Sequence, residues 1–94
     1  MAVLVKFVGS LCHISGAREI ALAYSEGFLL KDLILKVVTE KPGLESSLID
    51  RHLEDPKPNA LVLVNGREIS VLKGLETALK DGDEVVFVPV VHGG

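Results

Sequence analysis

The feature that most constrains this chain is one long stretch with helical periodicity, residues 28–41, whereas most of its other apolar stretches have the pattern of strands. Within it Leu33, Ile34 and Val37 recur at helical spacing, and charged side chains occupy the opposite face. A lone amphipathic helix must bury its apolar face against another element, and the rest of the chain offers mainly strands. The sequence therefore predicts an α+β domain in which one main helix covers one face of a mixed sheet.

The sequence marks the end of this helix clearly and its start poorly. Pro42 and Gly43 end it, because proline cannot continue the hydrogen-bond ladder of a helix. Ser25 is the only plausible N-cap before it, and no capping box follows that residue. A weaker helical pattern covers residues 44–53, and two prolines favour a loop over residues 54–59.

Patterns typical of strands occur before and after the helix in the sequence. Residues 2–8 and 18–24 predict a hairpin with a wide loop over 9–17, and residues 74–80 favour a turn or two of helix. Asn65-Gly66 and Asp81-Gly82-Asp83 are turn signals. The first and last strands are the most apolar, so we expect them to pair in the centre of the sheet. The predicted strands are residues 2–8, 18–24, 60–64, 67–71 and 84–91.

Size and charge exclude several classes of protein. The 94 residues suffice for one domain, which we expect over residues 1–91, with a flexible tail over 92–94. A net charge of −3 with scattered basic residues argues against direct nucleic-acid binding.

Cys12 is the only cysteine, which excludes an internal disulfide and a four-thiolate iron–sulfur cluster. No stretch resembles a signal peptide or a membrane span, so we expect a soluble, cytoplasmic protein with no membrane partner.

The last residues, "VPVVHGG", place two glycines directly after the most apolar stretch. A frayed end is the simplest interpretation. The alternative is chemical: the Gly94 carboxylate is an anion and a poor electrophile until adenylation by ATP activates it. Gly93 and Gly94 have no Cβ, so the walls of another protein's active site could close around their backbone. His92 to Gly94, fully extended, would reach roughly 10 Å beyond the sheet.

These stretches together resemble one branch of the β-grasp, or ubiquitin-like, fold. The resemblance covers essentially the whole chain and rests on "VLVKFVG", "LVLVNG", "LKDGDEVVFVPVV" and the terminal "HGG". The branch contains the small subunit of molybdopterin synthase, the thiamine-pathway sulfur carrier, the ubiquitin-related modifier of tRNA thiolation and archaeal small modifiers. His92 before the glycines is more similar to the tRNA-thiolation modifier than to the molybdopterin synthase subunit.

The resemblance implies a carrier with no catalytic residue and no bound cofactor of its own. A ubiquitin-activating-like enzyme would adenylate Gly94 with ATP, and a sulfur nucleophile would convert it to a thiocarboxylate. That sulfur would pass to a molybdopterin precursor, a tRNA base or a thiazole precursor, with the large subunit of molybdopterin synthase or a thiolation enzyme as a further partner. The first alternative is a protein modifier joined to lysines through Gly94, and the second is a non-covalent binding module.

The sheet face away from the helix is the expected partner surface, because exposed apolar patches usually mark interfaces. The alternative is a second layer, made by residues 43–58, that covers this face. The candidates for the surface are Leu4, Leu61, Leu63, Phe87 and Pro89.

The remaining polar residues favour structural roles. Cys12 and His13 are neighbours in a predicted loop and have no third partner for nucleophilic catalysis. His13, His52 and His92 lack metal-ligand spacing, so we expect no metal site, and His52 is expected at a surface or an edge. His92 would either contact the activating enzyme or simply be exposed. Asp81 and Asp83 are interpreted as turn residues rather than as a carboxylate pair.

Overall fold

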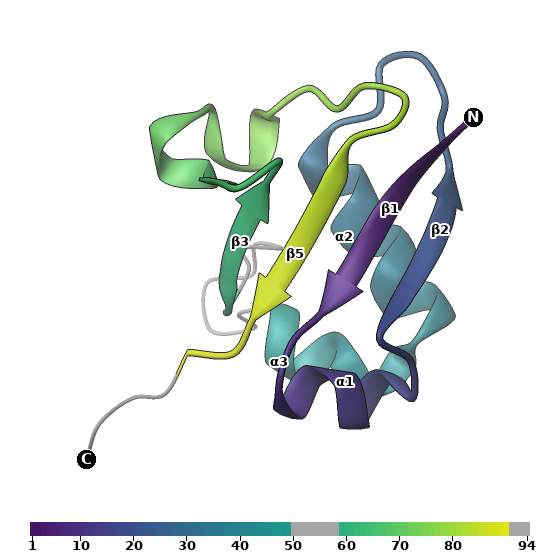
Figure 1. Cartoon of the computed structure of the whole chain (residues 1–94), viewed down its shortest axis with the longest axis vertical. Coiled ribbons are helices and arrows are strands. Elements are labelled where there is room, and N and C mark those ends of the chain that lie inside the picture. Colours follow the sequence, from purple (N-terminus) through teal and green to yellow (C-terminus); the bar gives the residue numbers. More distant parts are fainter. Residues whose placement is uncertain (50–58, 91–94) are drawn as a thin grey trace.

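The computed structural model describes residues 1–49 and 59–90 (Figure 1). Five strands form a single sheet in the order β2-β1-β5-β3-β4. The strands are β1 (Ala2–Phe7), β2 (Glu19–Ala23), β3 (Leu61–Val64), β4 (Arg67–Glu68) and β5 (Glu84–Val88). The helices are α1 (Ser10–Ser15), α2 (Leu30–Glu40) and α3 (Glu45–Leu48), and the 3₁₀ turns are η1 (Pro42–Leu44), η3 (Ile69–Val71) and η4 (Gly74–Glu76).

The central pair of the sheet is β1 and β5, as the sequence predicted. They run parallel, with Val5 opposite Val85, whereas β2 pairs antiparallel with β1 and β3 pairs antiparallel with β5. The strands β2 and β3 therefore run in the same direction and need a crossover between them. Helix α2 supplies that crossover and lies behind the sheet in Figure 1.

The core lies between α2 and one face of the sheet. Val3, Val5 and Phe7 alternate along β1 and are buried against Leu33 and Ile34 of α2. The rings of Phe7 and Phe87, on neighbouring strands, are stacked with centroids 6.0 Å apart. Leu44 and Leu48, from the weakly helical stretch, are also fully buried in this core. The prediction of one main helix over one face of a mixed sheet is confirmed.

The predicted wide loop over 9–17 is wrong in detail, because it contains α1. Gly9 (φ 59°) and Gly16 (φ 76°) flank this helix with backbone angles that favour glycine, and the Gly16 N–H donates to the Cys12 carbonyl. Leu11 and Ser15 occupy one face of the helix, one turn apart, and both are buried. Their spacing and the flanking glycines were the available signals for α1.

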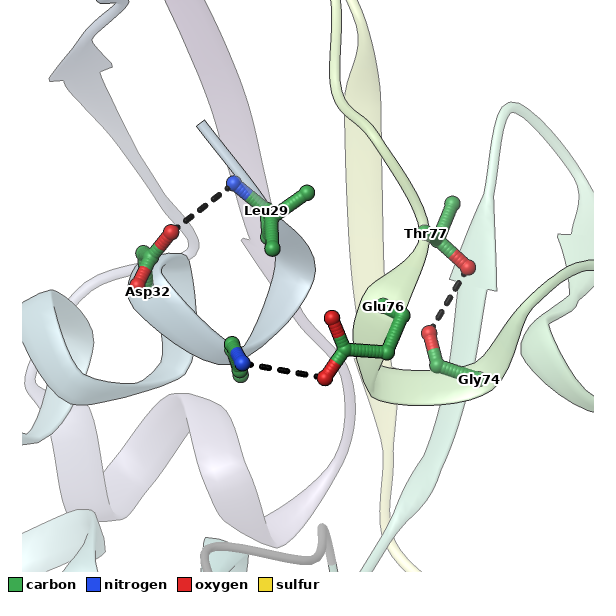
Figure 2. A network of polar contacts seen from close by, with 6 residues as sticks. Leu29, Asp32, Gly74, Glu76 and Thr77 are labelled. Atoms are coloured by element: carbon green, nitrogen blue, oxygen red, sulfur yellow. Dashed lines mark hydrogen bonds and ion pairs between the residues drawn. The ribbon is translucent and has the colours of Figure 1, made fainter. Parts of the chain in front are cut away.

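The start of α2 also differs from the prediction. Leu29, not Ser25, is the N-cap residue, and its N–H donates to Asp32 Oδ2 at 3.0 Å (Figure 2). Asp32 therefore satisfies one free backbone donor of the first turn from within the helix. Its negative charge also lies close to the positive end of the helix dipole.

Turn η4 is attached to the first turn of α2. The Leu30 N–H donates to the Thr77 carbonyl at 2.9 Å, and Lys31 Nζ lies 2.9 Å from Glu76 Oε1. Thr77 Oγ1 donates in turn to the Gly74 carbonyl at 2.7 Å, which closes the turn (Figure 2). These bonds connect the segment after β4 to the start of the helix.

The hairpin between β3 and β4 forms as predicted, but its second strand is short. Asn65 (φ 51°) and Gly66 (φ 82°) both adopt positive φ, as the tight turn requires. Strand β4 ends at Glu68, so the predicted strand over 67–71 is wrong beyond that residue. In the described parts of the chain, no helix is long and apolar enough to cross a membrane.

Candidate functional site

The last strand is held on both sides up to the point where it leaves the sheet. Val85 to Phe87 pair with β1 on one side and with β3 on the other, and Val88 lies opposite Leu61. Just beyond β1, the Val8 N–H donates to the Phe87 carbonyl at 3.1 Å. The described end of the chain therefore follows a strand that is paired on both sides.

A contact between Gly9 and Pro89 follows immediately. A Cβ at Gly9 would lie 3.3 Å from Pro89 Cγ, and the φ of Gly9 is +59°. Both the space and the backbone angle thus favour glycine at this position. Pro89 has no N–H, so it cannot extend the ladder of β5. The chain leaves the sheet here, and the last described residue, Val90, is 48% exposed.

The residues predicted to carry the chemistry, His92, Gly93 and Gly94, lie outside the described residues, as does His52. Their roles stay predictions. Covalent geometry limits the four residues 91–94 to a reach of at most about 14 Å from Val90. Any chemistry at Gly94 would therefore take place close to the end of β5 and to the surfaces that surround it.

The face of the sheet opposite α2 is turned toward the viewer in Figure 1, and the side chains on this face form an apolar patch. Leu61 is 37% exposed there, and the other members are half-buried. Their side chains alternate with the buried residues of the same strands, so the pleat of the sheet places them on this face. We define the open-face patch as Leu4, Leu61, Leu63, Val86 and Val88.

The predicted surface residues divide between the two faces. Leu4, Leu61 and Leu63 lie in the open-face patch, and Pro89 lies half-buried beyond its end. The prediction for Phe87 is wrong, because its side chain is 0% exposed and stacks with Phe7 in the core. Val86 and Val88 were missed. Because the sequence of β5 is apolar at every position from 85 to 88, its alternation could not reveal which side faces the helix.

Charged residues surround the open-face patch. Lys6 Nζ lies 3.1 Å from Glu84 Oε2, and both side chains are about two-fifths exposed. Glu68 lies opposite Leu63 in the pairing of β3 with β4. Hydrogen bonds from Ser70, through its side chain first and its backbone N–H second, lower the pKa of the Glu68 carboxyl. The patch therefore has an apolar centre and a rim of mixed charge, as protein interfaces commonly do.

A hollow of about 690 Å³ opens at the carboxyl end of β1, between α1 and the open-face patch. Cys12 and His13 both lie on its wall, and neither the Cys12 thiol nor the His13 imidazole makes a hydrogen bond with another described residue. The two residues are thus near the root of the tail but do not form a catalytic pair. The full lining is Lys6, Phe7, Val8, Gly9, Cys12, His13, Arg18, Glu19 and Val86.

The two aspartates of the last turn have structural partners. Asp81 Oδ1 accepts from the Ala2 N–H at 2.9 Å. Asp83 accepts from Asn65 Nδ2 at 2.9 Å and from the Lys80 N–H at 2.8 Å. Their interpretation as turn residues is confirmed. Among residues 1–49 and 59–90, no three His, Cys, Asp or Glu side chains gather as a metal site.

Comparison with known families and sequences extends this description. The model of the ThiS family matches residues 5–94. Small archaeal modifier protein 3 of Haloferax volcanii is 33% identical over 94 residues, with 100% of both chains covered. Ubiquitin-related modifier 1 of Schizosaccharomyces pombe is 47% identical over 99 aligned residues, again with 100% of both chains covered. These matches extend through the segment that carries the closing glycines.

Solved structures show the same arrangement of strands and helix. The small archaeal modifier protein 1 of Methanosarcina acetivorans superposes with a TM-score of 0.83 at 30% identity, covering 99% of this chain and 96% of that one. A chain from the complex of subunits 1 and 2 of the molybdopterin-converting factor of Helicobacter pylori superposes with a TM-score of 0.62 at 26% identity, and both chains are covered completely. The fold is thus the β-grasp that the sequence resembled.

Proposed function

The chain belongs to the ThiS family of ubiquitin-like sulfur carriers and small modifiers, and from that membership we propose that Gly94 is its reactive group. As a member of that family it is a carrier and not an enzyme. We propose further that Gly94 is adenylated and converted to a thiocarboxylate that donates sulfur. The observation that carries this proposal is the family match, which extends to residue 94.

The chemistry requires nothing catalytic from this chain. The Gly94 carboxylate would attack the α-phosphorus of ATP and release pyrophosphate, which leaves a mixed anhydride at the terminus. A persulfide or thiolate supplied by the partner would then attack the carbonyl carbon and displace AMP. A persulfide would give an acyl disulfide, and a second thiolate of the partner would attack the partner-side sulfur, so that the thiocarboxylate leaves and a disulfide forms on the partner. A thiolate would give a thioester, and hydrosulfide would convert it to the thiocarboxylate as the partner's thiolate leaves.

The described residues suit a carrier of this kind. Strand β5 is restrained on both sides, and the Gly9–Pro89 contact limits the directions in which the chain can continue. Because the strand before the tail is already fixed, less conformational entropy is lost when another protein binds the tail. The open-face patch begins at Val88 on the same strand, so an enzyme that binds the patch would also have Gly94 within reach.

The partners follow from the same argument. We propose that an adenylating enzyme of the ubiquitin-activating type binds the open-face patch. A large partner subunit that receives the sulfur would bind the same surface at a later step. A related chain of the Helicobacter pylori molybdopterin-converting factor was solved in a complex of subunits 1 and 2, which supports binding between a chain of this fold and a second subunit.

Intact mass of the protein purified from its native host tests the proposal. We expect the mass gain of one oxygen-to-sulfur exchange at the terminus, and this gain should be lost when Gly94 is deleted. Leu61→Asp should abolish the gain as well, because it places a charge in the open-face patch. Leu35→Asp is the matched control, since Leu35 is similarly exposed (47%) but lies on α2. Sulfur retained in the deletion variant would refute Gly94 as the reactive group.

A second function is favoured by the full-length similarity to a small archaeal modifier protein. In this alternative the adenylated Gly94 is attacked by a lysine amine, and an isopeptide bond forms as AMP leaves. We expect higher-mass conjugates in lysates, and these should disappear when Gly93 and Gly94 are deleted. The two functions share the activation step, so a chain that shows both products would be a carrier and a modifier.

A further inference from the structure

Strand β2 has an outer edge that no other described segment pairs with. It is the first strand in the order β2-β1-β5-β3-β4, and among the described strands it pairs with β1 alone. Figure 1 shows it at the margin of the sheet, with α2 behind it. The opposite edge, β4, is two residues long and is followed directly by turn η3. Thus β2 offers the longer free edge of the described sheet.

The pairing register shows which backbone groups point outward. The Phe7 N–H donates to the Arg18 carbonyl and the Tyr24 N–H donates to the Met1 carbonyl. In an antiparallel pair, bonded and non-bonded residues alternate. Glu19, Ala21 and Ala23 are therefore the non-bonded residues of β2. Their N–H and C=O groups point away from β1, toward solvent.

This edge carries one charged residue, Glu19, and otherwise lacks the features that usually prevent strands from pairing with each other. Exposed edge strands commonly carry proline, lysine or a bulge. The sequence of β2, EIALA, contains neither proline nor lysine, and its regular register with β1 contains no bulge. The side chains on the open face beside the edge are Glu19, Ala21 and Ala23, and all three are exposed. Two of them are small enough to let another backbone approach closely.

We propose that this edge pairs with the same edge of a second copy of the chain, antiparallel, with Ala21 on the twofold axis. Only this register uses all three outward-facing residues of both copies, because Glu19 then lies opposite Ala23 of the second copy. Shifting the axis to Glu19 would place two carboxylates directly opposite each other, which is unfavourable. Shifting it to Ala23 would bring in Gly27, whose φ of +83° is not that of a strand.

The same register matches side chains on the helix side of the edge. Half-buried Ile20 would lie opposite Leu22 of the second copy, which extends apolar contact across the junction. Arg18 is exposed, its side chain makes no hydrogen bond or ion pair among the described residues, and it would lie opposite Tyr24 of the second copy. A guanidinium next to a tyrosine ring is a favourable cation–π pair, and the twofold axis would repeat it.

The proposed dimer leaves the candidate site free. Because β1 and β5 run antiparallel to β2, the two copies of β5 would end at opposite ends of a continuous sheet. Both open-face patches would lie on the same side of that sheet. An edge of this length buries well under about 1,200 Å², the size of weak contacts, so we expect the dimer at high protein concentration.

Cysteine cross-linking tests the register in the full chain with Cys12→Ser. Ala21→Cys would place its two sulfurs across the axis, where the Cα atoms of a bonded pair lie about 5.5 Å apart. Ala23→Cys is the matched control, because the two copies of that residue would lie about 14 Å apart along the strands. Under mild oxidation we expect covalent dimer from Ala21→Cys on the order of ten-fold faster than from Ala23→Cys. Equal rates would overturn the proposal.

Sedimentation equilibrium and amide exchange test the association itself. The wild-type chain should dimerise with rising concentration, and the Glu19, Ala21 and Ala23 amides should become protected at the same time. Ala21→Lys should abolish both effects, because two lysines would face each other at the axis. Ser46→Lys adds the same charge at an exposed position of α3 and should change neither. A chain that stays monomeric at the highest soluble concentration, or an edge protected only by a different added protein, would overturn the proposal.

Discussion

The two faces of the sheet come from the same strands, and β5 is apolar on both of them, yet the faces differ in what covers them. Val85 and Phe87 are fully buried on the α2 side of β5, whereas Val86 and Val88 are half-buried on the open face. Burial against a helix gives the first pair its stabilising effect. The second pair remains partly in water, where its apolar surface contributes less to folding. The comparison separates residues that maintain the fold from residues that are available to a partner.

The largest expected effect tests this comparison directly. Val85→Asp places an uncompensated carboxylate in the core and should cost about 5 kcal/mol or more, enough to unfold the domain. Val86→Asp, one residue away, should cost only about 1 kcal/mol because its side chain reaches solvent. Urea denaturation of both variants measures the difference. Similar losses in the two variants would mean that the faces of β5 are not distinct.

Truncating one side chain on each face to alanine should also destabilise the buried face more than the open face, but by a smaller difference. Phe87→Ala removes a stacked, fully buried ring and should cost about 3–5 kcal/mol. Leu63→Ala removes a half-buried side chain from the open-face patch and should cost roughly a third of that. Thermal unfolding followed by circular dichroism would rank them. A Leu63 loss as large as that of Phe87 would show that the open face is covered in solution.

The end of the sheet should give an intermediate effect. Gly9→Ala combines an unfavourable positive φ with the Pro89 contact, so about 2 kcal/mol is expected. Gly16→Ala also has positive φ but meets no atom within 4 Å, and about 1 kcal/mol is expected. In a Pro89→Ala background, Gly9→Ala should cost less stability, because the part of the loss that comes from the contact with Pro89 is removed. No recovery would mean that Pro89 is not packed against Gly9.

The smallest expected effect concerns Glu68 at the rim of the patch. Its pKa is lowered from its ordinary value of 4.5 by the hydrogen bonds from Ser70. A lowered folded-state pKa contributes stability above the unfolded pKa, and that contribution is lost as the pH falls through the folded pKa. The wild type should therefore be slightly more stable than Glu68→Gln at neutral pH, and the gap should close below pH 4.5. A gap that widens in acid would contradict this sign.

Sequence patterns predicted much of the fold because they are local and repeated. The period of α2, the Asn65-Gly66 turn and the central pairing of the first and last strands are all confirmed. Helix α1 was missed because six residues give too short a pattern to distinguish from a loop. Strand β4 was predicted too long, since alternation over 67–71 cannot show that the chain leaves the ladder after Glu68.

The candidate site could be predicted only in part. Leu61 and Leu63 were identified as surface candidates, whereas Phe87 was assigned to the wrong face. The chemistry proposed for Gly94 was inferred from the terminal residues and from the family resemblance, and it remains to be tested. The Gly9–Pro89 contact could not be foreseen, because it joins two segments far apart in the sequence.

By itself the sequence determined the main helix, the turns and the central strand pair, because these depend on local patterns of residues. It also determined the family, because the match runs through residues 5–94. The tertiary structure decided which side of each strand is buried, and therefore which apolar residues remain available to partners. A strand that is apolar on both sides could pack either side against a helix. Only the position of α2 in the folded protein decides which side is buried. The same is true of the β2 edge, since a strand has a free edge only when the order of the whole sheet leaves it without a neighbour.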